Sequence, residues 1–145
     1  MKTIIVTGTS SGIGKEICIQ AAAKNFHVIS VSRNIEPLKD LDGIESFKLD
    51  ITHKDSVDEF VANLKNRKIK IDILINNAGY LVNELFGETT YDSFKKTFDV
   101  NVFGLAEITR SLIPIINKDG HVINISSIGG VNSSKKFPGL SAYSS

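Results

Sequence analysis

Residues 3–14, TIIVTGTSSGIG, join an apolar β-branched run to a glycine-rich turn, and a helix-like stretch continues to Asn25. Strand, glycine turn and helix in this order form an arrangement that binds a pyrophosphate. Gly8 permits the tight turn, the missing Cβ of Gly12 lets backbone N–H groups approach phosphate oxygens, and Gly14 lets the helix lie close to the strand. The helix then directs its free N–H groups and positive dipole end at the anion. This stretch predicts a dinucleotide-binding turn.

Length and composition limit the classes of protein that the chain can belong to. Its 145 residues predict one domain, residues 1–145, and a hydrophobic content of 41% argues against disorder. The formal net charge of +1 gives no electrostatic basis for binding nucleic acid or a membrane. No apolar run reaches the length of a membrane span, and no signal peptide precedes the first strand. A single cysteine, Cys18, excludes an intrachain disulfide, so we expect a cytoplasmic protein.

Apolar patterning predicts alternating strands and helices. We expect short strands over residues 3–7, 27–32, 44–50, 71–75 and 121–126. We expect helices over residues 12–25, 36–39, 56–67 and 91–116, the last bent near Pro114. The sequence also predicts that Ile13, Ile17 and Ala21 pack the first helix on the sheet. Thr52 and Asp55 resemble a capping box.

The strand and helix order predicts the fold class. It is α/β, a doubly wound Rossmann-type parallel sheet with helices on both faces and the strand order 3-2-1-4-5. Ligands bind such sheets beyond the carboxyl ends of the strands. The chemically interesting residues all fall at those ends: Gly8, Arg33, Asp50, Asn76, Asn77 and Ser127. This agreement between separate segments strengthens the dinucleotide-binding hypothesis.

Five motifs together resemble those of the short-chain dehydrogenase/reductase family, in the family's order. They are TGxxxGxG at 7–14, NNAG at 76–79, NVFG at 101–104, ISS at 125–127 and the late Tyr143. Three residues separate the first two glycines of the turn and one residue separates the last two. In the epimerase-like branch both separations are two residues. The resemblance covers the whole chain. It implies an NAD(P)(H)-dependent oxidoreductase that transfers hydride between nicotinamide and the carbonyl or secondary alcohol of a small molecule.

The resemblance also implies catalytic roles for three residues. Ser127 would hydrogen-bond the substrate oxygen, and Tyr143 would be the general acid/base. A tyrosine pKa of about 10 needs a nearby cation to fall toward neutrality, and the family uses a lysine four residues after the tyrosine. Asn101 would order a water chain behind that lysine. Two alternatives stay open, because Asn101 could simply cap or kink a helix and Ser127 could be only a loop serine.

A larger set of residues is expected to bind the cofactor. These are Gly8, Ser10, Ser11, Gly12, Ile13, Gly14, Arg33, Asp50, Ile51, Asn77, Ala78 and Gly79. By resemblance Asp50 and Ile51 flank the adenine and residues 77–79 line its ribose, although Asn77 fits a structural role equally well. The second strand ends on Ser32 and Arg33, with no carboxylate to repel a phosphate. NADP(H) is therefore preferred and NAD(H) stays an alternative, since Ser11 stands where phosphate-binding relatives often carry a basic residue.

The sequence departs from the family pattern in two places. It stops at Ser145, so the partner lysine and the last strands and helices would lie beyond it. We expect the amino-terminal part of a longer enzyme; the alternative is a non-catalytic dinucleotide-binding fragment or sensor module. The second departure is a longer spacing between Ser127 and Tyr143, with residues 132–136 as the expected insertion.

Two further expectations concern metals and partners. The three histidines do not cluster with other ligand types at metal spacing, so we assign no metal. The fifth strand would leave an exposed sheet edge, and the helix over residues 102–116 would leave an apolar side uncovered. Such surfaces associate, so we expect a homo-oligomer.

Overall fold

A computed structural model describes all residues from Met1 to Ser145 and contains one parallel sheet. The strand order is β3-β2-β1-β4-β5, which confirms the predicted doubly wound α/β fold. The strands are β1 (Thr3–Thr7), β2 (His27–Ser32), β3 (Ile44–Lys48), β4 (Ile71–Asn76) and β5 (Ile116–Asn124). All four pairings are parallel, so the carboxyl ends of the strands lie along one edge of the sheet.

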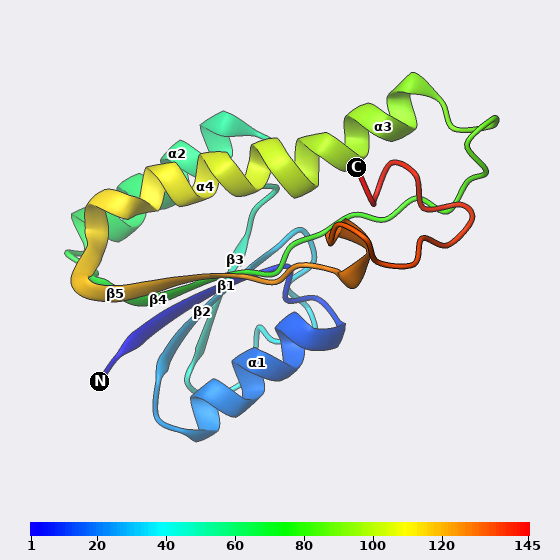
Figure 1. Cartoon of the computed structure of the whole chain (residues 1–145). Helices are drawn as coiled ribbons and strands as arrows, with labels where there is room; N and C mark the ends of the chain where they lie inside the picture. Colours follow the sequence, from blue (N-terminus) through cyan, green and yellow to red (C-terminus); the bar gives the residue numbers. More distant parts are fainter.

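Helices cover both faces of the sheet (Figure 1). One face carries α1 (Gly12–Ala23), and the other carries α2 (Lys54–Asn66) and the long rod of α3 (Tyr91–Phe98) and α4 (Leu105–Leu112). Alternation along β1 divides the core between the faces, with Ile5 in the cluster under α2 and α4 and Ile4 and Val6 in the cluster under α1. Both clusters are buried, which fixes the register of the central strand.

The predicted long helix over residues 91–116 is interrupted, so that prediction was wrong in detail. A π-helical turn, η1 (Asp99–Gly104), separates α3 from α4, and a 3₁₀ turn, η2 (Ile113–Ile115), ends the rod. Gly104 is buried at the end of the π turn, where an added Cβ would lie 2.9 Å from the Ile51 side chain. Close packing against the segment after β3 therefore accompanies the interruption. Single π turns inside helices are frequent at functional sites.

Three smaller predictions were also wrong. Residues 36–40 form a turn, with Lys39 N–H donating to the Ile35 carbonyl, because the segment is too short to nucleate a helix. The capping box is absent, since the Thr52 hydroxyl donates to Asp50 at 2.8 Å and α2 begins after His53 without a side-chain cap. Finally, β5 begins at Ile116 rather than at residue 121, with a register shift where the turn was expected.

Helix α1 packs on the sheet through Ile17 and Ala21, as predicted, but not through Ile13. Gly14, Cys18 and Ala21 are buried, whereas the Ile13 side chain is 62% exposed. The first turn of α1 approaches the sheet through Gly14 rather than Ile13, because Gly14 lies against the turn after β1 where no larger residue fits. Burial raises the pKa of the Cys18 thiol to about 12, so the thiol is protonated and unreactive at neutral pH.

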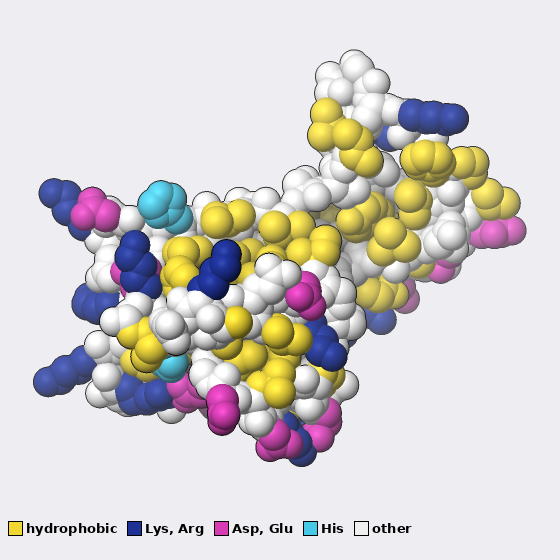
Figure 2. All heavy atoms as spheres, turned by 90° about the horizontal axis from the view of Figure 1, so that it is seen from below, with side chains coloured by type: hydrophobic (Ala, Val, Ile, Leu, Met, Phe, Trp, Pro, Cys, Tyr) yellow, Lys and Arg dark blue, Asp and Glu magenta, His cyan; other side chains and the backbone are white.

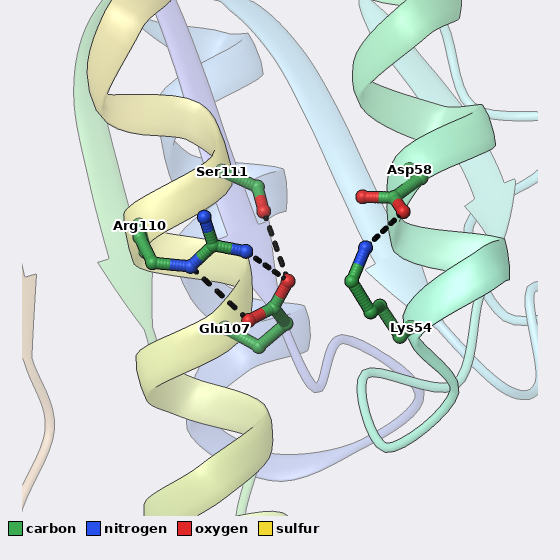
Figure 3. Close-up of polar contacts among 5 residues, drawn as sticks. All are labelled: Lys54, Asp58, Glu107, Arg110 and Ser111. Atoms are coloured by element: carbon green, nitrogen blue, oxygen red, sulfur yellow. Dashed lines mark hydrogen bonds and ion pairs between the residues drawn. The ribbon is translucent and has the colours of Figure 1, made fainter.

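Charged side chains line the groove between α2 and α4 (Figure 3). The Arg110 guanidinium donates to both carboxylate oxygens of Glu107, at 2.6 and 3.2 Å, while Lys54 pairs with Asp58 on the facing helix. The hydrogen bond to Asp58 and the charge of Glu107 raise the pKa of Lys54. These pairs are solvent-exposed and add little to stability. No helix of the chain is both long and apolar enough to span a bilayer.

Candidate functional site

A cleft of about 410 Å³ opens at the carboxyl ends of β1 to β4, where the fold predicts a ligand site. Ten of the fifteen sequence-predicted site residues line it: Gly8, Ser10, Ser11, Arg33, Asp50, Ile51, Asn77, Ala78, Gly79 and Tyr143. The five that do not line it are Gly12, Ile13, Gly14, Asn101 and Ser127. Segments far apart in the sequence therefore meet in one cavity.

The turn after β1 has backbone geometry that only glycine adopts easily. Gly8 and Gly12 have φ angles of +71° and +57°, in the left-handed region. A Cβ on Gly8 would lie 2.6 Å from the Ala78 Cα. A Cβ on Gly14 would lie 2.3 Å from the Asn77 amide nitrogen and 2.4 Å from the Gly8 carbonyl oxygen. The turn is thus packed directly against the start of the segment after β4.

The first turn of α1 is suited to an anion. Ser11 occupies the N-cap position but its side chain makes no capping hydrogen bond, and no acidic residue lies in the first turn. By contrast, α2 and α3 carry Asp55 and Asp92 in their first turns. The first N–H groups of a helix have no partner within it, so those of α1 are available to a bound phosphate.

Two residues tie β1 to the segment after β4. The Thr7 hydroxyl accepts from the backbone N–H groups of Asn77 and Ala78 at 3.1 and 3.0 Å. The Asn77 side-chain amide donates to the carbonyls of Thr7 and Gly8 at 3.1 and 2.9 Å. Asn77 therefore has the strand-tying role that the sequence allowed. The neighbouring Asn76 donates to Thr109 of α4 and to Asn124 of β5, both at 2.8 Å, and extends the tie across the sheet.

Two residues of opposite charge, Arg33 and Asp50, line the cleft. Arg33 follows β2 and is exposed, and Asp50 follows β3. Partial burial acts to raise the pKa of Asp50. Hydrogen bonds from the Thr52 N–H and hydroxyl, with the charges of His53 and Arg33, outweigh burial and lower this pKa below its usual value. Asp50 is therefore a carboxylate at neutral pH, and Arg33 has no side-chain hydrogen bond that would occupy its guanidinium.

Asn101 lies in the π turn and does not line the cleft, but its side chain contacts a residue that does. Its Oδ1 accepts from the Tyr80 N–H at 2.7 Å, and its Nδ2 donates to the Tyr80 carbonyl at 2.9 Å. Tyr80 itself lines the cleft, and the Lys96 ammonium lies 4.7 Å from the centroid of its ring. Asn101 thus fixes the loop that leaves β4.

Of the two residues predicted to supply catalytic hydroxyl groups, only one lines the cleft. Tyr143 lines the cleft, whereas Ser127 caps the short 3₁₀ turn η3 (Ile128–Gly130) by accepting from the Gly129 N–H at 3.1 Å. A Cβ built on Gly129 would lie 3.4 Å from the Ser127 Oγ and 3.2 Å from the Ser144 Oγ. Ser127 therefore lies beside the segment that carries Tyr143.

The sequence analysis missed part of the cleft wall. The additional lining residues are Val31, Ser32, Asn34, Leu49, Tyr80, Leu81 and Val100. Most directly adjoin a predicted residue at a strand end, so the positions after β2, β3 and β4 were the available signal. Val100 carried no such signal, because the π turn that places it was not predicted.

The comparison with protein families settles the relationship that these motifs suggest. A family model described as short chain dehydrogenase matches residues 2–145. The chain belongs to the short-chain dehydrogenase family. Its similar relatives include the uncharacterized oxidoreductase YusZ of Bacillus subtilis, 35% identical, with 98% of this chain and 53% of the relative covered. The fatty acyl-CoA reductase of Acinetobacter baylyi is 34% identical, with 98% and 51% covered.

Solved dehydrogenase structures match closely, and one of them is described as a short-chain dehydrogenase. One from Streptomyces avermitilis is 39% identical with a TM-score of 0.88, covering 99% of this chain and 54% of that one. Serine dehydrogenase complexed with NADP+ is 31% identical with a TM-score of 0.87, covering 98% and 59%. 4-Hydroxyisoleucine dehydrogenase complexed with NADH is 28% identical with a TM-score of 0.87, covering 99% and 62%. The chain spans about half the length of the curated relatives it matches.

Proposed function

We propose that the chain binds a nicotinamide dinucleotide in the cleft at the carboxyl ends of β1 to β4 and acts in hydride transfer. The observation that carries this proposal is the glycine turn, whose backbone approaches the NNAG segment too closely for any side chain. Gly8 and Gly12 of this turn have left-handed backbone conformations, and the N-terminus of α1 has no side-chain cap. The first turn of α1 also contains no acidic residue, so the site fits a diphosphate. The bound cofactor supplies the hydride, and the protein supplies position and charge.

NADP(H) is the preferred cofactor, because Arg33 follows β2 and presents a free guanidinium to the cleft. A guanidinium binds a phosphate through two parallel hydrogen bonds. The solved relatives support both choices, since one was complexed with NADP+ and another with NADH. The preference therefore rests on Arg33 and on the absence of a carboxylate at the end of β2.

The hydroxyl residues have distinct proposed roles. Tyr143 exchanges a proton with the oxygen of a small carbonyl or secondary alcohol, and Ser127 hydrogen-bonds the same oxygen. Asn101 acts by positioning, because its side-chain amide holds Tyr80 of the cleft wall. The exposed side chains of Val102, Phe103 and Ile113 support association into a homo-oligomer.

A second candidate is a dinucleotide-binding module without catalysis. It is favoured by one observation, that Ser127 does not line the cleft and its Oγ instead accepts the Gly129 N–H. Such a module would bind the cofactor as the catalytic form does. Only measurement of the chemical step separates the two.

Transfer of deuterium from 4-deuterated NADPH to 2-octanone, followed by mass spectrometry of the alcohol, tests the catalytic proposal. Because the resemblance places the partner lysine of Tyr143 four residues further on, the protein assayed includes the residues that follow Ser145. We expect it to transfer deuterium and its Tyr143→Phe variant to lose at least about 100-fold, the range for a general acid. Tyr91→Phe is the matched control, because that ring is 80% exposed on α3. Intact NADPH binding with no deuterium transfer would instead support the non-catalytic module.

A further inference from the structure

A second hollow adjoins the cleft at the end of the molecule that carries the long loops. It is a groove of about 430 Å³ between the loop after β4 and the last residues of the chain. Its lining residues are Leu85, Phe86, Lys136, Phe137, Pro138, Gly139, Leu140, Ser141 and Ser144. Figure 2 shows hydrophobic side chains gathered on the projecting part at the right, where Figure 1 places both loops. Its volume is in the range of small-molecule pockets.

The same two segments of the chain contribute different residues to the groove and to the cofactor cleft. In the loop after β4, Tyr80 and Leu81 line the cleft and the side chains a few residues further on line the groove. In the last segment, Tyr143 lines the cleft and the next residue, Ser144, lines the groove. The residue expected to meet the reacting oxygen, Tyr143, therefore directly precedes a residue that lines the groove.

Backbone contacts hold the two walls together. The Glu84 N–H donates to the Gly139 carbonyl at 2.9 Å, and Glu84 forms a parallel bridge with Leu140. Phe86 packs edge-on against Phe94 of α3, with ring centroids 6.5 Å apart. These contacts hold the two loops against each other and one of them against α3, so the groove is preformed, as small-molecule sites usually are.

Three large hydrophobic side chains at the groove are open to water. Leu85, Phe86 and Phe137 are 57%, 74% and 58% exposed. Burying such side chains under an apolar ligand is favourable in proportion to the area covered. The Ser141 hydroxyl is also buried and has no hydrogen-bond partner, although it lines the groove. A buried hydroxyl without a partner is costly, and a polar group on a ligand would satisfy it.

From this geometry we infer the substrate class: a carbonyl compound or secondary alcohol with an unbranched alkyl chain, whose chain lies between Leu85 and Phe137. This inference rests on the proposed function, since Tyr143 fixes where the reacting oxygen lies. The cleft holds the cofactor and the groove holds the chain. Chain length, rather than a charged substituent, then determines affinity.

Isothermal titration calorimetry with 2-butanone, 2-hexanone and 2-octanone at saturating NADP+ tests the inference without requiring turnover. We expect the dissociation constant to fall about fourfold for each added methylene, the effect of burying one such group. Leu85→Ser and Phe137→Ser should flatten this dependence while NADP+ affinity stays unchanged. Leu41→Ser is the matched control, since Leu41 is 43% exposed and lies in neither hollow.

The outcomes separate this inference from the proposed function. Tight NADP+ binding with affinity independent of chain length would overturn the inference alone. Chain-length dependence without NADP+ binding would support the groove and contradict the proposed function. Equal losses in Leu85→Ser and Leu41→Ser would overturn the inference. So would a dimer in sedimentation that Phe137→Ser dissociates without changing ketone affinity, because a second copy would then occupy the groove.

Discussion

The side-chain amide of Asn101 pairs with both backbone polar groups of Tyr80, accepting from its N–H at 2.7 Å and donating to its carbonyl at 2.9 Å. The pair joins the π turn between α3 and α4 to the wall of the cofactor cleft. A strand would satisfy these groups of Tyr80 by ladder hydrogen bonds, but the chain has already left β4. One asparagine therefore shapes the helix rod and the cleft together.

This pairing predicts the effect of Asn101→Asp. The substitution leaves an acceptor facing the Tyr80 carbonyl and removes one donor, so we expect a loss of about 1–3 kcal/mol in the free energy of unfolding. Urea denaturation measures it. The control is Asn132→Asp, because Asn132 only accepts a hydrogen bond, from the Ser133 N–H, and an aspartate accepts it equally well. Equal stability of the two variants would contradict the role given to Asn101.

The second prediction concerns the glycine turn. An added Cβ at Gly14 would overlap the Asn77 amide and the Gly8 carbonyl, at 2.3 and 2.4 Å. We expect Gly14→Ala to lower stability by about 1–3 kcal/mol through overpacking and to abolish NADPH binding. Thermal unfolding and fluorescence titration measure the two effects. Gly130→Ala should change neither, because nothing lies within 4 Å of its Cβ position; unimpaired binding by Gly14→Ala would refute the close approach.

A third prediction tests the cofactor preference. Arg33→Asp replaces a guanidinium at the end of β2 with a carboxylate, which repels the additional phosphate of NADPH. We expect NADPH to bind about 10- to 100-fold more weakly, the value of a lost charge-assisted hydrogen bond, and NADH to bind nearly as before. Lys118→Asp makes the same charge change on exposed β5 and should affect neither cofactor. Equal weakening of both cofactors by Arg33→Asp would refute the assignment.

A fourth prediction concerns acid stability. Arg67 donates to both carboxylate oxygens of Glu45 at 2.6 and 2.8 Å, and this lowers the pKa of Glu45 despite partial burial. A lowered pKa in the folded state adds stability above the unfolded pKa, and that stability is lost as pH falls through the folded pKa. Arg67→Gln should therefore lose less stability than the unaltered chain between about pH 5 and pH 3. The difference should stay below about 1 kcal/mol, because the pair is partly exposed.

Urea midpoints across that range measure the effect. Lys70→Gln removes one positive charge from an exposed lysine and should leave the pH dependence of the unaltered chain intact. A parallel change in Arg67→Gln and Lys70→Gln would show that net charge, rather than the Glu45–Arg67 pair, controls acid stability.

The central part of the fold was predictable because its signals are local. The apolar run before Gly8 and the glycines after it define a strand, a turn and a helix within about twenty residues, as the binding motif requires. The strand order follows from the alternation of strands and helices and the handedness of crossovers. The residues at strand ends then meet in one cleft, with Arg33, Asp50 and Asn77 as predicted lining residues.

Features that depend on tertiary contacts were not predictable. The π turn follows contacts of Gly104 with Ile51 and of Asn101 with Tyr80, all distant in sequence. The exposure of Ile13 follows from the close approach of Gly14 to the turn after β1, which the spacing of Ile13 and Ile17 does not report. The apolar groove depends on two loops meeting, and neither loop has a periodic pattern. The sequence pattern therefore predicts the position of the cofactor cleft but not the presence of the apolar groove.

Fluorescence titration of the chain with NADPH tests most directly whether the turn after β1 holds a diphosphate. The account predicts a saturable change in emission with one equivalent bound per chain. It also predicts displacement by ADP, which carries the same diphosphate. A chain that is folded by circular dichroism yet gives no saturable signal, or gives one that ADP leaves unchanged, would contradict it.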